Sequence, residues 1–236
     1  MSGDAPDTAT STGARAGELL VAAPLRIEAA LIASAGRTVT GLRTGLLAGG
    51  PARPRARSER GRGAPLVRKT GMGPARSKAA AGALAGAAGG AVLVLGFCGG
   101  LDASSVPGEV IVAEEVYAAT DEGHAEERVR CELGGQLVQR LAGRGMKVRA
   151  GKVVCVARLA LGERRAQLHA DGAIAVDMES VWLASGAGGR PFGVVRVVLD
   201  SPEHELLRVQ AAAGALRAAR ALRRVAGALH DWAPAL

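Results

Sequence analysis

The chain has 236 residues, of which 48% are hydrophobic and 2% aromatic, and its formal net charge is +8 at pH 7. A chain of this length and hydrophobic content can bury a sizeable core, which excludes a disordered protein. Because the chain has so few aromatic side chains that could stack on nucleic-acid bases, we expect no nucleic-acid partner despite the basic charge. That charge fits a weak attraction to an anionic membrane surface.

The three cysteines, Cys98, Cys131 and Cys155, lack the spacing of a metal site and leave one thiol over in any disulfide scheme. We therefore expect reduced thiols and no bound metal. Neither a signal peptide nor a run of roughly 18 apolar residues, the length of a membrane span, is recognisable. The expected location is the cytoplasm, with peripheral membrane contact as a further option.

The predicted elements alternate between strands and helices. Residues 1–17 show no periodicity and are expected to form a disordered tail, followed by a single domain over 18–236. This alternation predicts an α/β fold, a three-layer α/β/α sandwich with a central mixed, twisted sheet. Strands are predicted at 18–23, 65–70, 91–96, 108–113, 148–156, 173–176 and 191–200, and helices at 24–32, about 74–89, 133–142, near 181–184 and about 206–232.

Residues 49–63 form a run rich in Arg, Pro and Gly. The simplest interpretation is a solvated hairpin loop, which needs no binding function. If the run has a function, we expect attraction to acidic lipid head groups. Its arginines are Arg53, Arg55, Arg57, Arg60 and Arg62.

The most informative stretch is 173–180, in which four apolar residues lead into Asp177, Met178, Glu179 and Ser180. This pattern predicts a buried strand that gives way to a helix, with both carboxylates at the junction. Carboxylates in such a place are costly to desolvate unless they are paired or used in chemistry. An isolated pair of this kind is more often a helix cap than a catalytic group, so its meaning depends on other segments.

The stretch resembles the ribose-binding signature of the nucleoside phosphorylase and nucleosidase superfamily. Other segments resemble the same superfamily in the same order, and the resemblance extends over about 19–232. It implies a fold like that of purine nucleoside phosphorylase, cleavage of an N-glycosidic bond, and a homo-oligomer. The segments are those around Glu28, Gly71-Met72-Gly73, the Gly-rich turn expected at 96–101, and 196–200.

The resemblance implies two catalytic residues, Asp200 and Glu28. Asp200 would protonate the purine at N7, since a carboxyl group at the mouth of a buried strand can keep its proton near neutrality. Glu28 would activate a water molecule, although its context also fits an exposed helix glutamate. Phosphorylases of the superfamily use an arginine near this helix, and Arg26 resembles it. Water and phosphate therefore both remain candidates for the nucleophile, and no cofactor is implied.

The resemblance also implies the substrate-binding residues. Glu179 would accept both ribose hydroxyls, because one carboxylate offers two oxygens. Met178 would lie against the sugar and Asp177 would serve as a supporting or capping group. Backbone N–H groups of Gly71 and Gly73 could hold an anion, although glycines also suit any tight turn. The other candidates are Val176, Phe97, Cys98, Gly99, Arg26, Ser201 and His204.

Several segments resemble one branch, the hopanoid-associated phosphorylases, which implies a lipid-linked nucleoside, adenosylhopane, as the substrate and adenine as a product. These segments are 68–74, 96–101, 107–116 and 200–206, and His204 and Glu205 would lie beside the site. Phe97 replaces the usual small hydroxyl residue, and Val94 replaces the phosphate-binding arginine of hexameric phosphorylases.

Three alternatives remain. A methylthioadenosine/S-adenosylhomocysteine nucleosidase would carry Ser, Asp and a base-stacking Phe where this chain has 154–159, and none is present there. A futalosine nucleosidase would use the same machinery for the base and the ribose. A catalytically inactive relative would bind a nucleoside without cleaving it.

Overall fold

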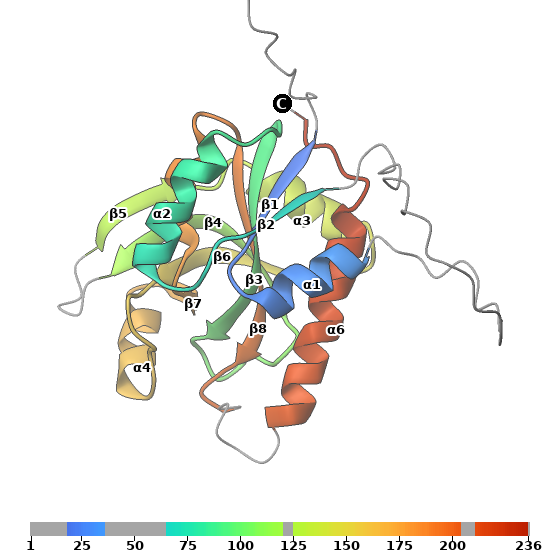
Figure 1. Cartoon of the computed structure of the whole chain (residues 1–236). Coiled ribbons are helices and arrows are strands. Elements are labelled where there is room, and N and C mark those ends of the chain that lie inside the picture. Colours follow the sequence, from blue (N-terminus) through green and yellow to red (C-terminus); the bar gives the residue numbers. More distant parts are fainter. Residues whose placement is uncertain (1–17, 36–64, 120–124, 204–210, 236) are drawn as a thin grey trace, which may run out of the picture.

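The computed structural model describes residues 18–35, 65–119, 125–203 and 211–235 (Figure 1). The predicted tail, the Arg-rich run at 49–63, and His204 and Glu205 lie outside these residues. The strands are β1 (Leu19–Ala23), β2 (Leu66–Lys69), β3 (Ala91–Gly100), β4 (Val110–Ala119), β5 (Ala125–Arg130), β6 (Val148–Cys155), β7 (Ala173–Asp177) and β8 (Phe192–Asp200). The helices are α1 (Arg26–Ala35), α2 (Pro74–Ala85), α3 (Gly134–Ala142), α4 (Glu163–Ala170), α5 (Ser180–Ala184), α6 (Ala211–Leu229) and the 3-10 helix η1 (Ser185–Ala187).

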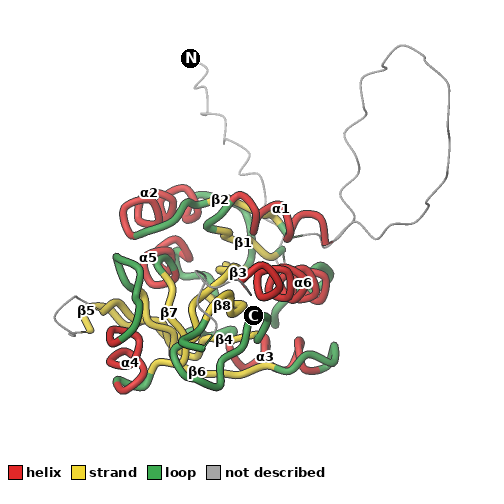
Figure 2. The backbone as a smooth tube through the Cα atoms, turned by 90° about the horizontal axis from the view of Figure 1, so that it is seen from below, coloured by secondary structure: helices red, strands yellow, loops and turns green. Residues whose placement is uncertain are grey.

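The strands form one mixed sheet in the order β2-β1-β3-β7-β6-β4-β5. Strand β8 pairs with β3 in parallel and with β4 in antiparallel orientation. The pairs β4–β6, β6–β7 and β7–β3 complete a closed ring of five strands. Figure 2 shows these strands gathered in the middle of the molecule, with the helices around them.

Alternate residues of the strands face opposite layers, as the period of a strand requires. On one face Leu20 and Ala22 join a buried cluster with residues of α2 and α5, including Leu84 and Leu183. On the other face Leu19, Val21 and Ala23 join a second cluster with residues of α1, α3 and α6, including Ile32, Leu137 and Leu222. The predicted three-layer α/β fold is therefore confirmed, and it includes the ring that the sequence pattern did not reveal.

Most predicted elements are present with shifted bounds. The predicted strand 91–96 is buried along its whole length, as expected for a central strand. The Gly-rich turn predicted at 96–101 is wrong, because β3 continues as a strand to Gly100. An added Cβ on Gly96 would lie 2.5 Å from the Glu28 carboxylate, so this glycine makes room for a neighbouring side chain instead of turning the chain. Strand β5 and helix α4 had not been predicted.

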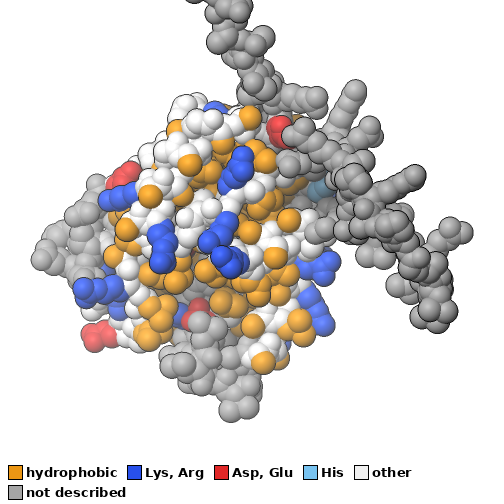
Figure 3. Space-filling view, viewed as in Figure 1, with side chains coloured by type: hydrophobic (Ala, Val, Ile, Leu, Met, Phe, Trp, Pro, Cys, Tyr) orange, Lys and Arg blue, Asp and Glu red, His pale blue; other side chains and the backbone are white. Residues whose placement is uncertain are grey.

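Lys and Arg side chains are spread among hydrophobic ones over the face shown in Figure 3, where acidic side chains are few. This distribution accords with the net charge of +8. No helix within the described ranges is long and apolar enough to cross a membrane.

Candidate active site

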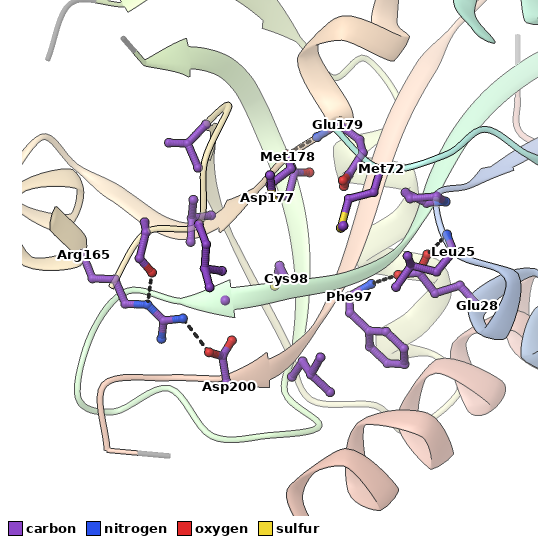
Figure 4. A pocket seen from close by; sticks show the side chains of 17 residues that line it. Leu25, Glu28, Met72, Phe97, Cys98, Arg165, Asp177, Met178, Glu179 and Asp200 are labelled. Atoms are coloured by element: carbon purple, nitrogen blue, oxygen red, sulfur yellow. Dashed lines mark hydrogen bonds and ion pairs between the residues drawn. The ribbon is translucent and has the colours of Figure 1, made fainter. Parts of the chain in front are cut away.

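A cavity of about 150 Å³ lies where β3, β7 and β8 meet the start of α1 and the segment between β6 and α4 (Figure 4). Among the described residues, those that were predicted from the sequence and line the cavity are Glu28, Phe97, Cys98, Gly99, Val176, Asp177, Met178, Glu179 and Asp200. Residues from four separate segments of the chain are thus brought to one place.

The other predicted residues lie elsewhere. Arg26 is exposed on α1 and is not part of the cavity wall. Ser201 is buried directly after Asp200, and Gly73 contacts the site through its backbone. Gly71 and Gly73 both have positive φ, 97° and 88°, and form the turn between β2 and α2.

Glu28 is a buried carboxylate with only 1% of its surface exposed. The backbone N–H of Leu25 donates to Oε2 at 2.6 Å and that of Phe97 donates to Oε1 at 2.7 Å. Burial raises the pKa of Glu28, and this effect exceeds the lowering by Arg196 and the two N–H groups. The alternative of an exposed helix glutamate is therefore wrong, and Glu28 is a fixed group with an increased affinity for protons.

Asp177 and Glu179 share a buried cation, Arg196, which has no exposed surface. Nη2 of Arg196 lies 2.6 Å from Oδ2 of Asp177 and 3.3 Å from Oε2 of Glu179. Asp177 also accepts hydrogen bonds from the N–H groups of Glu179 and Ser180, where α5 begins. Asp177 thus has the capping contacts expected of it, while Glu179 remains part of the cavity wall.

The two carboxylates differ in their protonation. Burial raises the pKa of Glu179 to about 7, an effect larger than the lowering by Arg196. Burial also acts on Asp177, but the charge of Arg196 and the hydrogen bonds from Cys155 and Ser180 outweigh it, so the pKa of Asp177 is lowered. Asp177 therefore stays ionised as the partner of Arg196, and Glu179 titrates near neutral pH.

Asp200 ends β8 and is paired with an arginine that the sequence had not suggested. Nη2 of Arg165 lies 2.6 Å from Oδ2 of Asp200, and both side chains are buried. Arg165 comes from α4 and is also held by a bond of 2.9 Å from its Nε to the carbonyl oxygen of Ala160. Of the cavity-lining residues that the structure describes, Arg165 is the one cation.

Only one of the two site arginines left a signal in the sequence. Arg196 stands alone among valines in the middle of β8, and a single charge in a buried strand must have a partner. Arg165 follows Glu163 and Arg164 in a short polar helix and looks like any solvated residue. In the described part of the chain, no group of three His, Cys, Asp or Glu side chains is placed to hold a metal ion.

Solved structures with the same fold cover nearly the whole chain. A futalosine hydrolase of Helicobacter pylori has a TM-score of 0.68 and 16% identity, over 91% of this chain and 97% of that one. A 5′-methylthioadenosine/S-adenosylhomocysteine nucleosidase of the same organism, solved with butyl-thio-DADMe-Immucillin-A, has a TM-score of 0.65 and 15% identity, again over 91% of this chain and 97% of that one. The corresponding nucleosidase of Neisseria meningitidis, in complex with methylthio-immucillin-A, has a TM-score of 0.64 and 19% identity, over 90% and 98%.

At these identities the likeness shows the fold. No match was found among curated proteins. The family model of the phosphorylase superfamily matches residues 42–227, which is most of the chain. The chain therefore belongs to the phosphorylase superfamily and is an enzyme that cleaves N-glycosidic bonds.

Proposed function

We propose that the protein hydrolyses the N-glycosidic bond of a 5′-substituted adenosine and releases adenine. The observation that carries this proposal is the placement of two buried carboxylates along β3. Glu28 is bonded to Phe97, and Asp200 pairs with Gly99, two residues or about 7 Å further along the strand. One carboxylate can then serve the leaving base while the other serves the nucleophile.

In the proposed reaction Asp200 gives a proton to the purine as the bond between nitrogen and the anomeric carbon breaks. The sugar passes through an oxocarbenium-like state, by analogy with other glycosidic cleavages. Water attacks the anomeric carbon and transfers a proton to Glu28, which is fixed by two N–H groups. Glu179 accepts the ribose hydroxyls with its two oxygens.

Water fits the cavity better than phosphate does. The cavity is lined by Glu28, Asp177, Glu179 and Asp200, and a phosphate dianion among carboxylates needs a free cation. Of the described lining residues only Arg165 carries a positive charge, and it is bonded to Asp200. Arg196 donates to Asp177 and Glu179, and Arg26 is exposed outside the cavity. We therefore propose water as the nucleophile and assign Arg26 no part in the reaction.

The rim of the cavity suits an apolar 5′ substituent. Met72 and Leu159 line the cavity and keep 48% and 64% of their surface exposed, so an apolar group could cover them. Together with the resemblance to hopanoid-associated phosphorylases, this makes adenosylhopane our first candidate substrate. A lipid-linked substrate of this kind would bring the enzyme to a membrane, where its basic surface could bind acidic head groups. We propose in addition that the enzyme is a homo-oligomer, in which a second copy of the chain would cover Met72 and Leu159.

The test is base release from adenosylhopane in detergent, from methylthioadenosine and from futalosine, each with and without phosphate. We expect adenine from adenosylhopane at a rate that phosphate does not change. Strict phosphate dependence would show that phosphate, not water, is the nucleophile, and Arg26 would again be a candidate for binding it. Release from methylthioadenosine or futalosine alone would overturn the lipid-linked substrate, and no release from any of them would indicate a binding protein.

A further inference from the structure

The ion pair between Arg165 and Asp200 bears directly on the proposed acid, and the inference drawn from it rests on the proposed function. Arg165 is 3% exposed and Asp200 is 5% exposed, so the pair is shielded from water. A buried pair with an N–O distance of 2.6 Å is a charge-assisted hydrogen bond of the stronger kind. The position of the Asp200 carboxylate is therefore set by α4, a helix that contributes no other charged group to the cavity wall.

The pair leaves the two oxygens of Asp200 in different situations. Oδ2 receives the hydrogen bond from Arg165. Oδ1 lies over Gly99, where an added Cβ would come within 3.3 Å of it and within 3.1 Å of Nη2 of Arg165. Gly99 thus leaves open the space beside both groups, and Oδ1 is the oxygen that can meet a base in the cavity.

The guanidinium itself is aligned by two bonds, one to Asp200 and one to the carbonyl oxygen of Ala160. Its remaining group, Nη1, is buried without a hydrogen-bond partner. Leaving a buried donor unpaired costs free energy, of the order of 1–3 kcal/mol. A role limited to anchoring α4 would not need a charged group at this cost, because a neutral donor could bind Ala160.

We propose that Arg165 is a positioning residue for proton transfer to the purine. It holds Oδ2 of Asp200 and directs Oδ1 at the base, so that the proton moves from Oδ1 to the purine as the glycosidic bond breaks. Because Oδ2 is held by Arg165, the direction in which Oδ1 faces the cavity is set before the base binds. Arg165 therefore acts through Asp200, by fixing the position of its carboxylate.

The experiment compares Arg165→Gln, Asp200→Asn and the double variant on two substrates. One is the purine nucleoside that the wild-type enzyme cleaves, and the other is 4-nitrophenyl riboside, whose phenolate leaves without protonation. We expect Arg165→Gln to lower kcat on the purine nucleoside about 10²-fold or more and to change kcat on the phenyl riboside about threefold at most. The double variant should be no slower than Asp200→Asn, because Arg165 acts through Asp200.

Arg164→Gln, one residue away in the same helix, is the matched control and should leave both rates unchanged. Arg165→Lys keeps the charge without the planar fork and should recover part of the purine rate. An equal loss on both substrates in Arg165→Gln, or additive losses in the double variant, would show a merely structural role and overturn the proposal.

Binding of free adenine, measured by calorimetry, separates this inference from the proposed reaction. We expect Arg165→Gln and Asp200→Asn to weaken adenine binding at least tenfold, with no further loss in the double variant. If no nucleoside is cleaved but adenine binding follows this pattern, the reaction is wrong and the positioning role stands. Adenine that binds equally well to wild type and to all three variants would overturn the positioning role.

Discussion

The backbone N–H of Phe97 donates to the carboxylate of Glu28 at 2.7 Å, although the two residues are 69 positions apart in the chain. The second N–H, from Leu25, comes from the residue just before α1. The carboxylate is therefore held between the start of a helix and a central strand, and its orientation is fixed before any substrate arrives. A base that is already oriented does not have to lose rotational freedom during the reaction.

Glu28→Gln tests this base. The amide keeps the shape of the side chain but cannot take a proton from water, so we expect kcat to fall about 10²–10⁴-fold. Binding of the nucleoside, measured by calorimetry, should change little. Glu114→Gln, on an exposed position of β4, serves as the control. A kcat close to that of the wild type would exclude Glu28 as the base.

Asp200→Asn tests the acid. A carboxamide can still bind the base, although more weakly, but it has no proton of suitable acidity to give. We therefore expect kcat to fall far more than the affinity for the nucleoside. Single-turnover measurements at saturating nucleoside would report the chemical step alone. Normal turnover in this variant would show that another group protonates the purine.

The pH dependence of kcat/KM tests the two raised pKa values. Glu179, with a pKa of about 7, accepts both ribose hydroxyls at full strength only as a carboxylate, and Glu28 accepts a proton only when ionised. Both groups ionise as the pH rises, so kcat/KM should increase between about pH 6 and pH 8. Glu179→Gln should remove the step near pH 7 and reduce the preference for ribose over 2′-deoxyribose. A flat profile over this range would contradict both assignments.

Gly96→Ala tests the space beside the base. The new Cβ would lie 2.5 Å from Oε1 of Glu28 and 2.9 Å from Nη1 of Arg196, so the Glu28 carboxylate must move. We expect a large loss of kcat in a protein that still folds. Gly82→Ala in α2, where no atom lies within 4 Å of an added Cβ, should keep full activity and gain up to about 1 kcal/mol in stability. Equal activities of the two variants would argue against a fixed Glu28.

Arg196→Met tests the buried charge network. The substitution leaves Asp177 and Glu179 without their cation, and we expect the free energy of unfolding in urea to fall by about 3–5 kcal/mol. Adding Asp177→Asn and Glu179→Gln to Arg196→Met should restore part of this loss, because no unpaired charge then remains buried. A decrease below about 1 kcal/mol in Arg196→Met would mean that the network contributes little to stability.

Apolar runs and the segments that resemble the superfamily were enough to predict the sheet, most helices and much of the cavity wall. The parts that were missed have specific causes. Strand β5 has the charged sequence Ala-Glu-Glu-Arg-Val-Arg, which is not typical of a strand, and among the described strands it pairs with β4 alone. The glycines of β3 suggested a turn, because the side chains that occupy their space come from distant segments. Arg165 was missed for the same reason, since its partner lies 35 residues away.

The closed ring of strands has a consequence for how the protein folds. Strand β3 must find β1, β7 and β8, whose positions in the sequence range from residue 19 to residue 200. Pairings between such distant segments form slowly, because a long loop must close before each contact is made. The carboxylates of the cavity can therefore meet only when these late pairings are complete. In refolding experiments, recovery of enzyme activity should lag behind recovery of the helical circular dichroism signal.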